Sequence, residues 1–374
     1  MSLQPLEVKD LVKKIMKNEE VFILDVRGED DYENWKIEGK SVTTMNIPLK
    51  EIKQDPGKAK EKLPDEGPIY AVCAKGISSQ DGVEILKEAG VSEITHVVDG
   101  MNGWSEHLEP VKISKLPGEG GALYQFVRLG KGCLSYIIES DGEAVIVDPN
   151  RMTHFYTDFV EEQGLKIKAV IDTHLHADHI SGGREIAKQY DAEYYFPDKD
   201  DEGVEFEYNP LKDGDEIKAG AAALKAFYSP GHTIGSTSLI VNDEFLLTGD
   251  ILFVESIGRP DLAGKAEDWV EDLRETLYDR YKNLAGDLTV LPSHFGEMSE
   301  LNEDGSVSDK LNALYEKNKK LNVDDAGEFR HMVTDNLPEQ PNSHEEIRKT
   351  NMGKSHPDPD EKQSMETGPN NCSV

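Results

Sequence analysis

Three histidines and an aspartate lie within six consecutive positions of this chain, as His174, His176, Asp178 and His179. Neutral imidazoles and carboxylates are the ligands that transition metals prefer in proteins, so a cluster of this kind predicts a metal site. The apolar run Ala169–Ile171 before the cluster indicates a buried strand, and a helical pattern begins near Ile180. We therefore expect the strand to end in a loop that directs all four side chains toward one point. The alternative, histidines that are merely solvated or satisfied in a core, fits a lone histidine better than this cluster.

Three more ligand-type side chains directly follow predicted strands, each in a turn that contains glycine or proline. His232 follows the strand predicted at 224–228, Asp250 follows 244–247, and His294 follows 288–291. One residue of this kind is usually structural. Four such strand ends in one domain, counting the first cluster, predict that the side chains converge on metal.

A different chemistry is indicated near residue 73, where a cysteine ends the apolar run Ile69–Val72 and a helix is expected from Ser79. A loop between a strand and a helix aims backbone N–H groups and the positive helix end at its centre, which favours a thiolate or persulfide anion. The predicted loop consists of Cys73, Ala74, Lys75, Gly76, Ile77 and Ser78. The alternative is a buried structural cysteine. For the other thiols we expect a packed core position at Cys133 and a mobile, sulfur-relaying or simply solvated thiol at Cys372.

The elements that position these groups divide the 374 residues into an α/β chain of two domains. Strands alternate with helices in residues 1–110, which predicts a doubly wound parallel sheet. A segment rich in glycine at 111–120 reads as a linker. Strands and helices then continue through 121–320. Residues 321–374 are polar and acidic, and predict an extended segment that wraps rather than a third domain.

Composition restricts the function classes. The formal net charge of −32 repels nucleic acid and anionic membranes, so neither is expected as a partner. The sequence has no apolar run long enough for a membrane span and no apolar signal-peptide core near its start. Its three cysteines are far apart, which is typical of a cytoplasmic protein with free thiols. The sequence is also compatible with a homo-oligomer.

Residues 5–108 resemble the rhodanese sulfurtransferase family. The resemblance rests on Leu24-Asp25-Val26-Arg27, Asn46-Ile47-Pro48, the loop that begins at Cys73, and Gly100-Met101-Asn102-Gly103-Trp104. It implies that Cys73 carries a persulfide. Many members have an arginine where this chain has Ser78, which implies that thiosulfate is a poorer sulfur donor here. Lys75 could replace that positive charge in part.

Residues 116–320 resemble the metallo-β-lactamase superfamily, whose fold is an αββα sandwich. All seven ligand-type positions match: His174, His176, Asp178, His179, His232, Asp250 and His294. Most members are dinuclear zinc hydrolases. The branch usually joined to a rhodanese domain is that of the persulfide dioxygenases, which bind one iron. That resemblance implies Fe(II) at His174, His232 and Asp250, with His176, Asp178, His179 and His294 around it, and Arg259 as an arginine that orients the substrate.

These resemblances together imply a fusion enzyme, an iron-dependent dioxygenase with a sulfurtransferase domain. It would use O₂ to oxidise a low-molecular-weight persulfide, such as glutathione persulfide, to sulfite. Sulfane sulfur would pass through Cys73, with thiosulfate as a further substrate or product. One alternative is a hydrolase with two zinc ions that cleaves a thioester, like glyoxalase II. A second alternative is a non-enzymatic sulfur carrier or sensor whose metal is structural.

Overall fold

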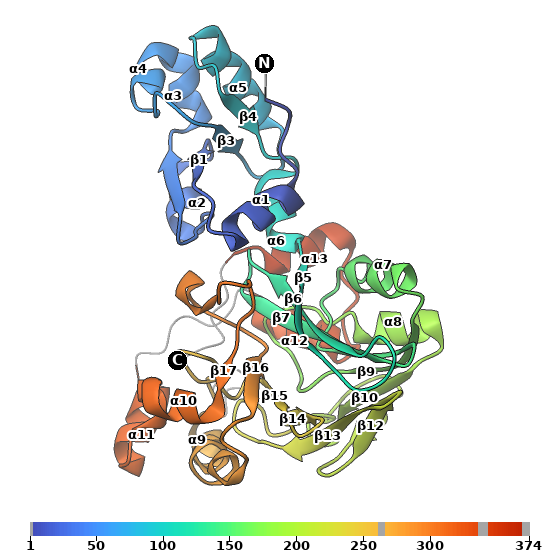
Figure 1. The fold of residues 1–374 in the computed structure, drawn as a ribbon. Coiled ribbons are helices and arrows are strands. Elements are labelled where there is room, and N and C mark those ends of the chain that lie inside the picture. The colour runs from blue at the N-terminus through green and yellow to red at the C-terminus, as the bar shows by residue number, and fades with distance from the viewer. Residues whose placement is uncertain (1–2, 261–265, 336–342, 369–374) are drawn as a thin grey trace.

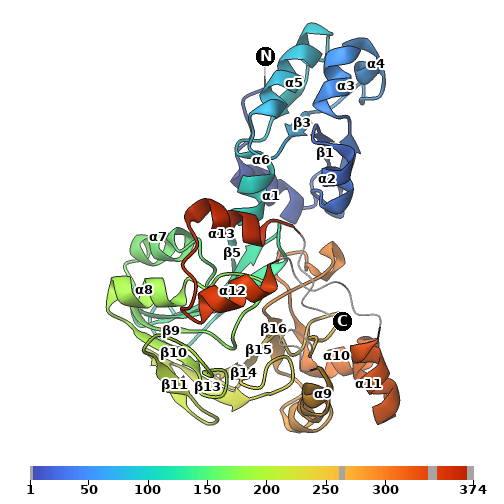
Figure 2. The same cartoon turned by 180° about the vertical axis from the view of Figure 1, so that it is seen from behind.

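A computed structural model describes residues 3–260, 266–335 and 343–368. Figures 1 and 2 show a small N-terminal domain standing on a larger second domain, with the C-terminal helix α13 beside their junction. No helix in the described ranges is both long and apolar enough to cross a membrane.

The N-terminal domain is a four-stranded parallel sheet with strand order β2-β1-β3-β4, as predicted. Its amphipathic first helix buries Leu11, Val12 and Ile15. The elements, in chain order, are α1 (Val8–Met16), β1 (Val21–Asp25), α2 (Glu29–Asn34), β2 (Val42–Asn46), α3 (Leu49–Gln54), α4 (Pro56–Glu61), β3 (Ile69–Val72), α5 (Ser78–Glu88), β4 (Ile94–His96) and α6 (Gly100–Glu106).

The second domain contains two sheets packed face to face. The first has seven strands in the order β11-β10-β9-β8-β7-β6-β5, and the second has six in the order β12-β13-β14-β15-β16-β17. The strands are β5 (Glu109–Lys115), β6 (Ala122–Arg128), β7 (Cys133–Ser140), β8 (Glu143–Val147), β9 (Lys166–Ile171), β10 (Glu193–Pro197), β11 (Asn209–Leu211), β12 (Glu216–Ala219), β13 (Ala222–Tyr228), β14 (Thr237–Val241), β15 (Phe245–Gly249), β16 (Thr289–Pro292) and β17 (Asp309–Lys310).

Helices cover the outer faces of both sheets, which gives the expected αββα sandwich. The first sheet is covered by α7 (His154–Glu162) and α8 (Gly183–Tyr190), which bury residues such as Tyr156 and Ile186. The second is covered by α9 (Ala266–Glu275), α10 (Leu311–Lys317) and α11 (Ala326–Thr334). A π-helical turn at Thr276–Arg280 directly follows α9.

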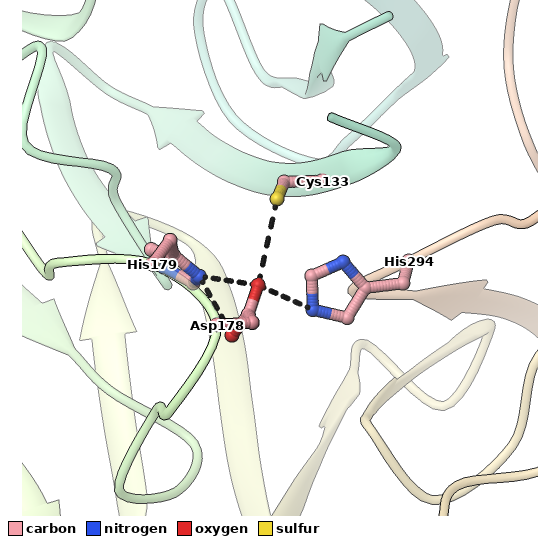
Figure 3. Close-up of side chains that lie close together, drawn as sticks. All are labelled: Cys133, Asp178, His179 and His294. Atoms are coloured by element: carbon pink, nitrogen blue, oxygen red, sulfur yellow. Dashed lines mark hydrogen bonds and ion pairs between the residues drawn. The ribbon is translucent and has the colours of Figure 1, made fainter. Parts of the chain in front are cut away.

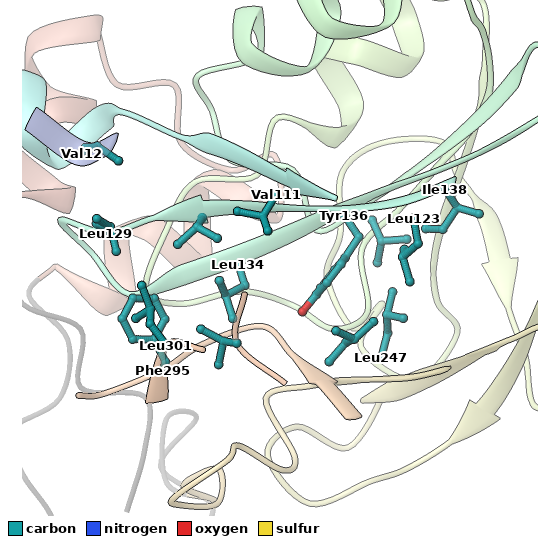
Figure 4. Close-up of a cluster of buried hydrophobic side chains, with 14 of the residues drawn as sticks. Val12, Val111, Leu123, Leu129, Leu134, Tyr136, Ile138, Leu247, Phe295 and Leu301 are labelled. Atoms are coloured by element: carbon teal, nitrogen blue, oxygen red, sulfur yellow. The ribbon is translucent and has the colours of Figure 1, made fainter. Parts of the chain in front are cut away.

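The core between the sheets continues into the N-terminal domain. Figure 4 shows Leu123, Tyr136 and Ile138 of the first sheet facing Leu247 of the second. The same buried cluster includes Val12 of α1 and Leu129. Because one apolar cluster spans both domains, burial of apolar surface holds them together.

The predicted linker at 111–120 is wrong in its first half. Residues Glu109–Lys115 form β5, which pairs antiparallel with β6 at the edge of the seven-stranded sheet. Such an edge strand alternates between partly buried and exposed positions and lacks an apolar run. Its sequence pattern is therefore also typical of a linker. Only the glycine-rich turn that follows it connects elements, closed by the hydrogen bond from Gly121 N to Gly118 O.

The C-terminal segment wraps around the second domain as expected, but it is helical where an extended chain was predicted. It contains α11, α12 (His344–Asn351) and α13 (Pro359–Glu366). These helices bury few apolar residues, such as Phe329 and Ile347, which is too little for a clear helical period in the sequence. Helix α13 has a clear start signal, a capping box between Asp358 and Glu361. Cys372 lies outside the described residues.

Candidate metal centre and cysteine loop

Three strand ends bring His174, His232 and Asp250 together. They follow β9, β13 and β15, and one ligand atom from each lies within 4.8 Å of the other two. The Nε2 atoms of His174 and His232 lie 3.6 and 3.5 Å from Asp250 Oδ2. Each side chain is about 1% exposed. The sequence therefore predicted correctly that these three distant residues converge.

Hydrogen bonds fix which ring nitrogen of each histidine carries the proton. Nδ1 of His232 lies 2.8 Å from the carbonyl oxygen of Arg259, which only accepts, so Nδ1 is protonated. The hydroxyl of Thr173 donates to Asp148 and therefore accepts from Nδ1 of His174. Both imidazoles thus direct an unprotonated Nε2 toward Asp250, as ligand histidines do.

The charges at this triad also suit a cation. Burial, together with neighbouring histidines for His174, lowers the pKa of His174 and His232, which keeps both rings neutral at pH 7. Nε2 of His174 and both oxygens of Asp250 are buried without a hydrogen-bond partner among the described residues. A buried carboxylate oxygen that accepts no hydrogen bond is costly, and a bound metal would satisfy it. The triad therefore fits a metal ion.

His176 has a different environment from the triad. Its Nε2 lies 3.2 Å from Asp148 and 3.9 Å from Asp172, and all three side chains are buried. Burial alone would lower the pKa of His176, but the two carboxylates outweigh it and raise that pKa to about 9. Asp148 also accepts hydrogen bonds from Thr173 and from Ser293, the residue before His294. His176 and Asp148 thus tie the loops of the site to one another.

A second group of buried ligand-type residues adjoins the triad, and Figure 3 shows it. Asp178 lies at its centre, with Oδ2 at 3.1 Å from His179 Nδ1, 3.3 Å from His294 Nε2 and 3.6 Å from Cys133 Sγ. His294 Nε2 is also 3.2 Å from Asp250 Oδ2. Cys133 is buried, as expected, but it contacts this polar cluster, whereas its sequence neighbours predicted only core packing.

Two further anchors of the site had no signal in the sequence. The buried carboxylate of Asp200 accepts hydrogen bonds from Leu175 N, Thr233 Oγ1 and Gly235 N, and so joins the loop of His174 to the loop of His232. Asn351 of α12 donates from its amide to the carbonyl oxygens of His176 and His179. Both lie far along the chain from the loops they hold, which is why no local pattern revealed them.

Arg259 is 1% exposed, so it is not a surface residue. Its carbonyl oxygen holds His232, as described above. The preceding Gly258 passes so close to the carbonyl oxygen of Asp250 that a Cβ would lie 1.7 Å away. Only glycine fits there, and this close approach brings Arg259 beside the triad.

Cys73 lies where β3 ends and α5 begins, as predicted. Its Sγ accepts a hydrogen bond from Ser79 N at 3.3 Å and lies 3.4 Å from Ser79 Oγ. Its carbonyl oxygen, and that of Ala74, accept from Met101 N and Asn102 N of α6. Lys75 and Ile77 are exposed on the outside of the loop. The loop therefore holds a buried sulfur with a backbone N–H directed at it.

Comparisons with known proteins agree with this division of the chain. Residues 8–107 match the family model of the rhodanese-like domain, and residues 128–284 match that of the metallo-beta-lactamase superfamily. The probable metallo-hydrolase YqgX of Bacillus subtilis is 30% identical over 188 residues, which cover 45% of this chain and 88% of that protein.

Two other relatives are informative. The mitochondrial persulfide dioxygenase ETHE1 of Bos taurus is 30% identical over 154 residues, 41% of this chain; the match spans only 59% of that relative. The crystal structure of a metallo-beta-lactamase from Staphylococcus aureus superposes with a TM-score of 0.58 at 27% identity, covering 63% of this chain and 73% of that one.

Proposed function

This chain belongs to the metallo-beta-lactamase superfamily and carries a rhodanese-like domain, and from that premise we propose that it is a persulfide dioxygenase with a sulfurtransferase domain. The reaction would convert a low-molecular-weight persulfide, O₂ and water into the thiol, sulfite and two protons. The named relatives of the second domain include a persulfide dioxygenase and a probable metallo-hydrolase.

The observation that carries the proposal is the separate triad of His174, His232 and Asp250. Two neutral imidazoles and one carboxylate form the ligand set of non-haem Fe(II) oxygenases, which leaves coordination positions for substrate and O₂. Bound iron would supply the redox chemistry that joins oxygen to sulfur. His176 differs from the two triad histidines because Asp148 and Asp172 hold its Nε2. This difference favours one catalytic ion over a symmetric pair.

The protein's own groups would position the reactants. The guanidinium of Arg259, a residue whose backbone carbonyl contacts His232, would attract the anionic persulfide or a carboxylate of its carrier. Thr173 and the Arg259 carbonyl would keep Nε2 of each triad histidine free of its proton. Burial of the site would exclude bulk water from the reacting sulfur.

The rhodanese-like domain would handle the sulfane sulfur. A persulfide on Cys73 would transfer its outer sulfur to sulfite, which yields thiosulfate and leaves the Cys73 thiolate. The Ser79 N–H would stabilise that thiolate by its hydrogen bond to Sγ. The same exchange run backward would load Cys73 from thiosulfate.

Oxygen consumption tests the proposal. Iron-loaded, anaerobically purified protein should consume O₂ when glutathione persulfide is added, and Asp250→Ala should abolish that consumption. Cys73→Ser should leave O₂ uptake in place and remove sulfur exchange between thiosulfate and thiols. If the iron-loaded wild-type protein consumes no O₂ with this substrate, the dioxygenase assignment is wrong.

A dinuclear zinc hydrolase of the glyoxalase II type is the second candidate. The observation that favours it is the group of Asp178, His179 and His294 next to the triad, since His294 Nε2 lies 3.2 Å from Asp250 Oδ2. Zinc ions held by these residues would lower the pKa of a water molecule, which would supply the nucleophile for the carbonyl of the thioester. Metal analysis separates the two candidates: a dioxygenase should contain about one iron per chain, and the hydrolase about two zinc ions.

A further inference from the structure

A short hairpin carries two residues of the metal centre. It spans residues 251–258, begins directly after Asp250 and ends directly before Arg259. The hydrogen bond from Phe253 N to Ser256 O closes its turn. Because Asp250 supplies the carboxylate of the triad and the Arg259 carbonyl orients a triad histidine, movement of this hairpin would displace both.

Packing fixes the base of the hairpin more firmly than its tip. Ile251, Leu252 and Ile257 are fully buried in the apolar cluster beneath the helices of the second sheet. The tip at 253–256 includes the exposed Glu255. Its backbone N–H and C=O groups need hydrogen-bond partners, which the hairpin itself supplies only in part. The position of the tip therefore depends on polar groups from elsewhere in the chain.

The carboxylate of Glu300 joins the hairpin tip to the segment that follows His294. Its Oε2 accepts a hydrogen bond from Glu255 N at 3.3 Å, and its Oε1 accepts from Gly296 N at 2.7 Å and from Glu297 N at 3.0 Å. The side chain is buried, since Glu300 is 5% exposed. One buried carboxylate thus bridges two backbone segments that leave the metal centre.

The side-chain amide of Asn318, another buried residue, holds the same tip. Its Nδ2 lies 3.0 Å from Ser256 O, 3.4 Å from Phe253 O and 3.5 Å from Val254 O. Its Oδ1 accepts a hydrogen bond from Lys320 N, which fixes the way the amide faces. Both anchors lie beyond residue 284, where the match to the metallo-beta-lactamase family model ends.

A local structural role explains only some of these contacts. Glu297 and Glu300 form a capping box around a short 3₁₀ turn, which accounts for the bond from Glu297 N but not for the bond from Glu255 N. Burial also raises the pKa of the Glu300 carboxyl, a cost that an exposed capping acid would avoid. Phe253 of the tip lies edge-on to His294, with ring centroids 6.1 Å apart, so movement of the tip would reach the loop of His294 as well.

We propose that Glu300 and Asn318 are positioning residues of the metal centre. They hold the hairpin so that Asp250 and Arg259 keep their places around a bound ion, as Asp200 does for the loops of the two triad histidines. The inference rests on a metal at the triad, and it holds for either candidate reaction. Without these anchors the hairpin would keep its packed base, but its tip would move and the triad carboxylate would bind metal less tightly.

Zinc affinity of the full-length chain, measured by competition with a chromogenic chelator, tests the proposal. Glu300→Gln keeps the shape of the side chain but turns an NH₂ group toward a backbone N–H, so we expect about 10-fold weaker zinc binding. Glu297→Gln is the matched control, because it removes the same charge from the same capping box and leaves the hairpin contact in place. Its zinc affinity should equal that of wild type.

A second pair of variants leaves the carboxylate unchanged. Asn318→Ala should also weaken zinc binding, whereas Asn302→Ala should not, because the exposed amide of Asn302 donates to two serines outside the hairpin. Hydrogen exchange in metal-free protein gives a readout that needs no metal. The Glu255 amide should exchange faster in Glu300→Gln than in Glu297→Gln, because it loses its acceptor only in the first variant.

Equal zinc affinities within a folded pair would overturn the role of that anchor, and equal affinities within both pairs would overturn the proposal. Equal exchange at residue 255 would overturn the role of Glu300. Weaker zinc binding in both anchor variants would support the proposal even if wild-type protein consumed no O₂ with a persulfide, because this measurement needs metal binding and not turnover. Failure of the positioning role is therefore distinguishable from failure of the proposed function.

Discussion

Glu366 of α13 lies at the junction of the two domains and can be changed without altering its shape. Its buried carboxylate accepts hydrogen bonds from Arg128 Nη2 at 2.9 Å and from Ile180 N at 2.7 Å, and lies 3.2 Å from Arg151 Nε. Ile180 directly follows His179 of the metal loop. The Glu366→Gln substitution keeps the volume but removes the charge, and leaves Arg128 buried without its anionic partner.

The expected cost follows from these contacts. Removing one partner of a buried ion pair costs about 3–5 kcal/mol. Arg128 keeps its hydrogen bonds to Ser105 O and Asn150 Oδ1 in the variant. We therefore expect Glu366→Gln to lose about 3 kcal/mol of stability, the lower end of that range. This energy corresponds to a roughly 150-fold rise in the open population of α13 and the 179–180 loop. Hydrogen exchange of the α13 amides measures that rise directly.

The pH dependence of this effect has a defined sign. Burial alone would raise the pKa of Glu366, but Arg128 and Arg151 outweigh it and lower the pKa below its usual value. Ionised Glu366 therefore contributes stability above its unfolded pKa of about 4.3, and this stability is lost as pH falls through the folded value. The difference between wild type and Glu366→Gln should be full at pH 7 and shrink below about pH 4.

The exposed Asp360 on the same helix gives a matched control. Asp360→Asn removes one negative charge from α13 without breaking a buried pair, so its hydrogen exchange should stay close to that of wild type. The reasoning would be refuted if Glu366→Gln exchanged like Asp360→Asn at pH 7, or if its defect were the same at every pH.

Three further changes test the site. Gly132→Ala should lower the melting temperature more than Gly142→Ala, because both glycines have positive φ but only at residue 132 would the added Cβ meet backbone, at 2.4 Å from Phe295 O; equal losses would argue against a close approach. Asp200→Asn should weaken metal binding by about 10-fold in a chelator competition, since the loops of His174 and His232 lose their shared acceptor; unchanged affinity would contradict that role. Metal removal should lower the melting temperature reversibly, because an ion present at 100 times its Kd contributes about 2.7 kcal/mol to the free energy of unfolding. An unchanged melting curve would count against a bound ion.

What the sequence could predict depended on how local the signal was. His174, His232 and Asp250 each follow an apolar strand, and the repetition of ligand-type residues at such strand ends was the signal that predicted their convergence. The loop of Cys73 was recognisable for the same reason. Cys133 has no such signal, because its place beside Asp178 depends on a bridge between residues 133 and 294. Long-range contacts of this kind leave no trace in a local pattern.

The contacts of α13 bear on how the two domains would exchange sulfur. Gln363 accepts a hydrogen bond from Asn102 and donates one to Glu106, both in α6, whose first turn holds the Cys73 loop. Three residues later, Glu366 holds the backbone next to His179. One short helix thus ties the cysteine loop and the metal loop to the same support, and a shared apolar cluster packs the domains together. Because neither loop is free to swing toward the other, this arrangement favours a diffusible small-molecule carrier of sulfur between them.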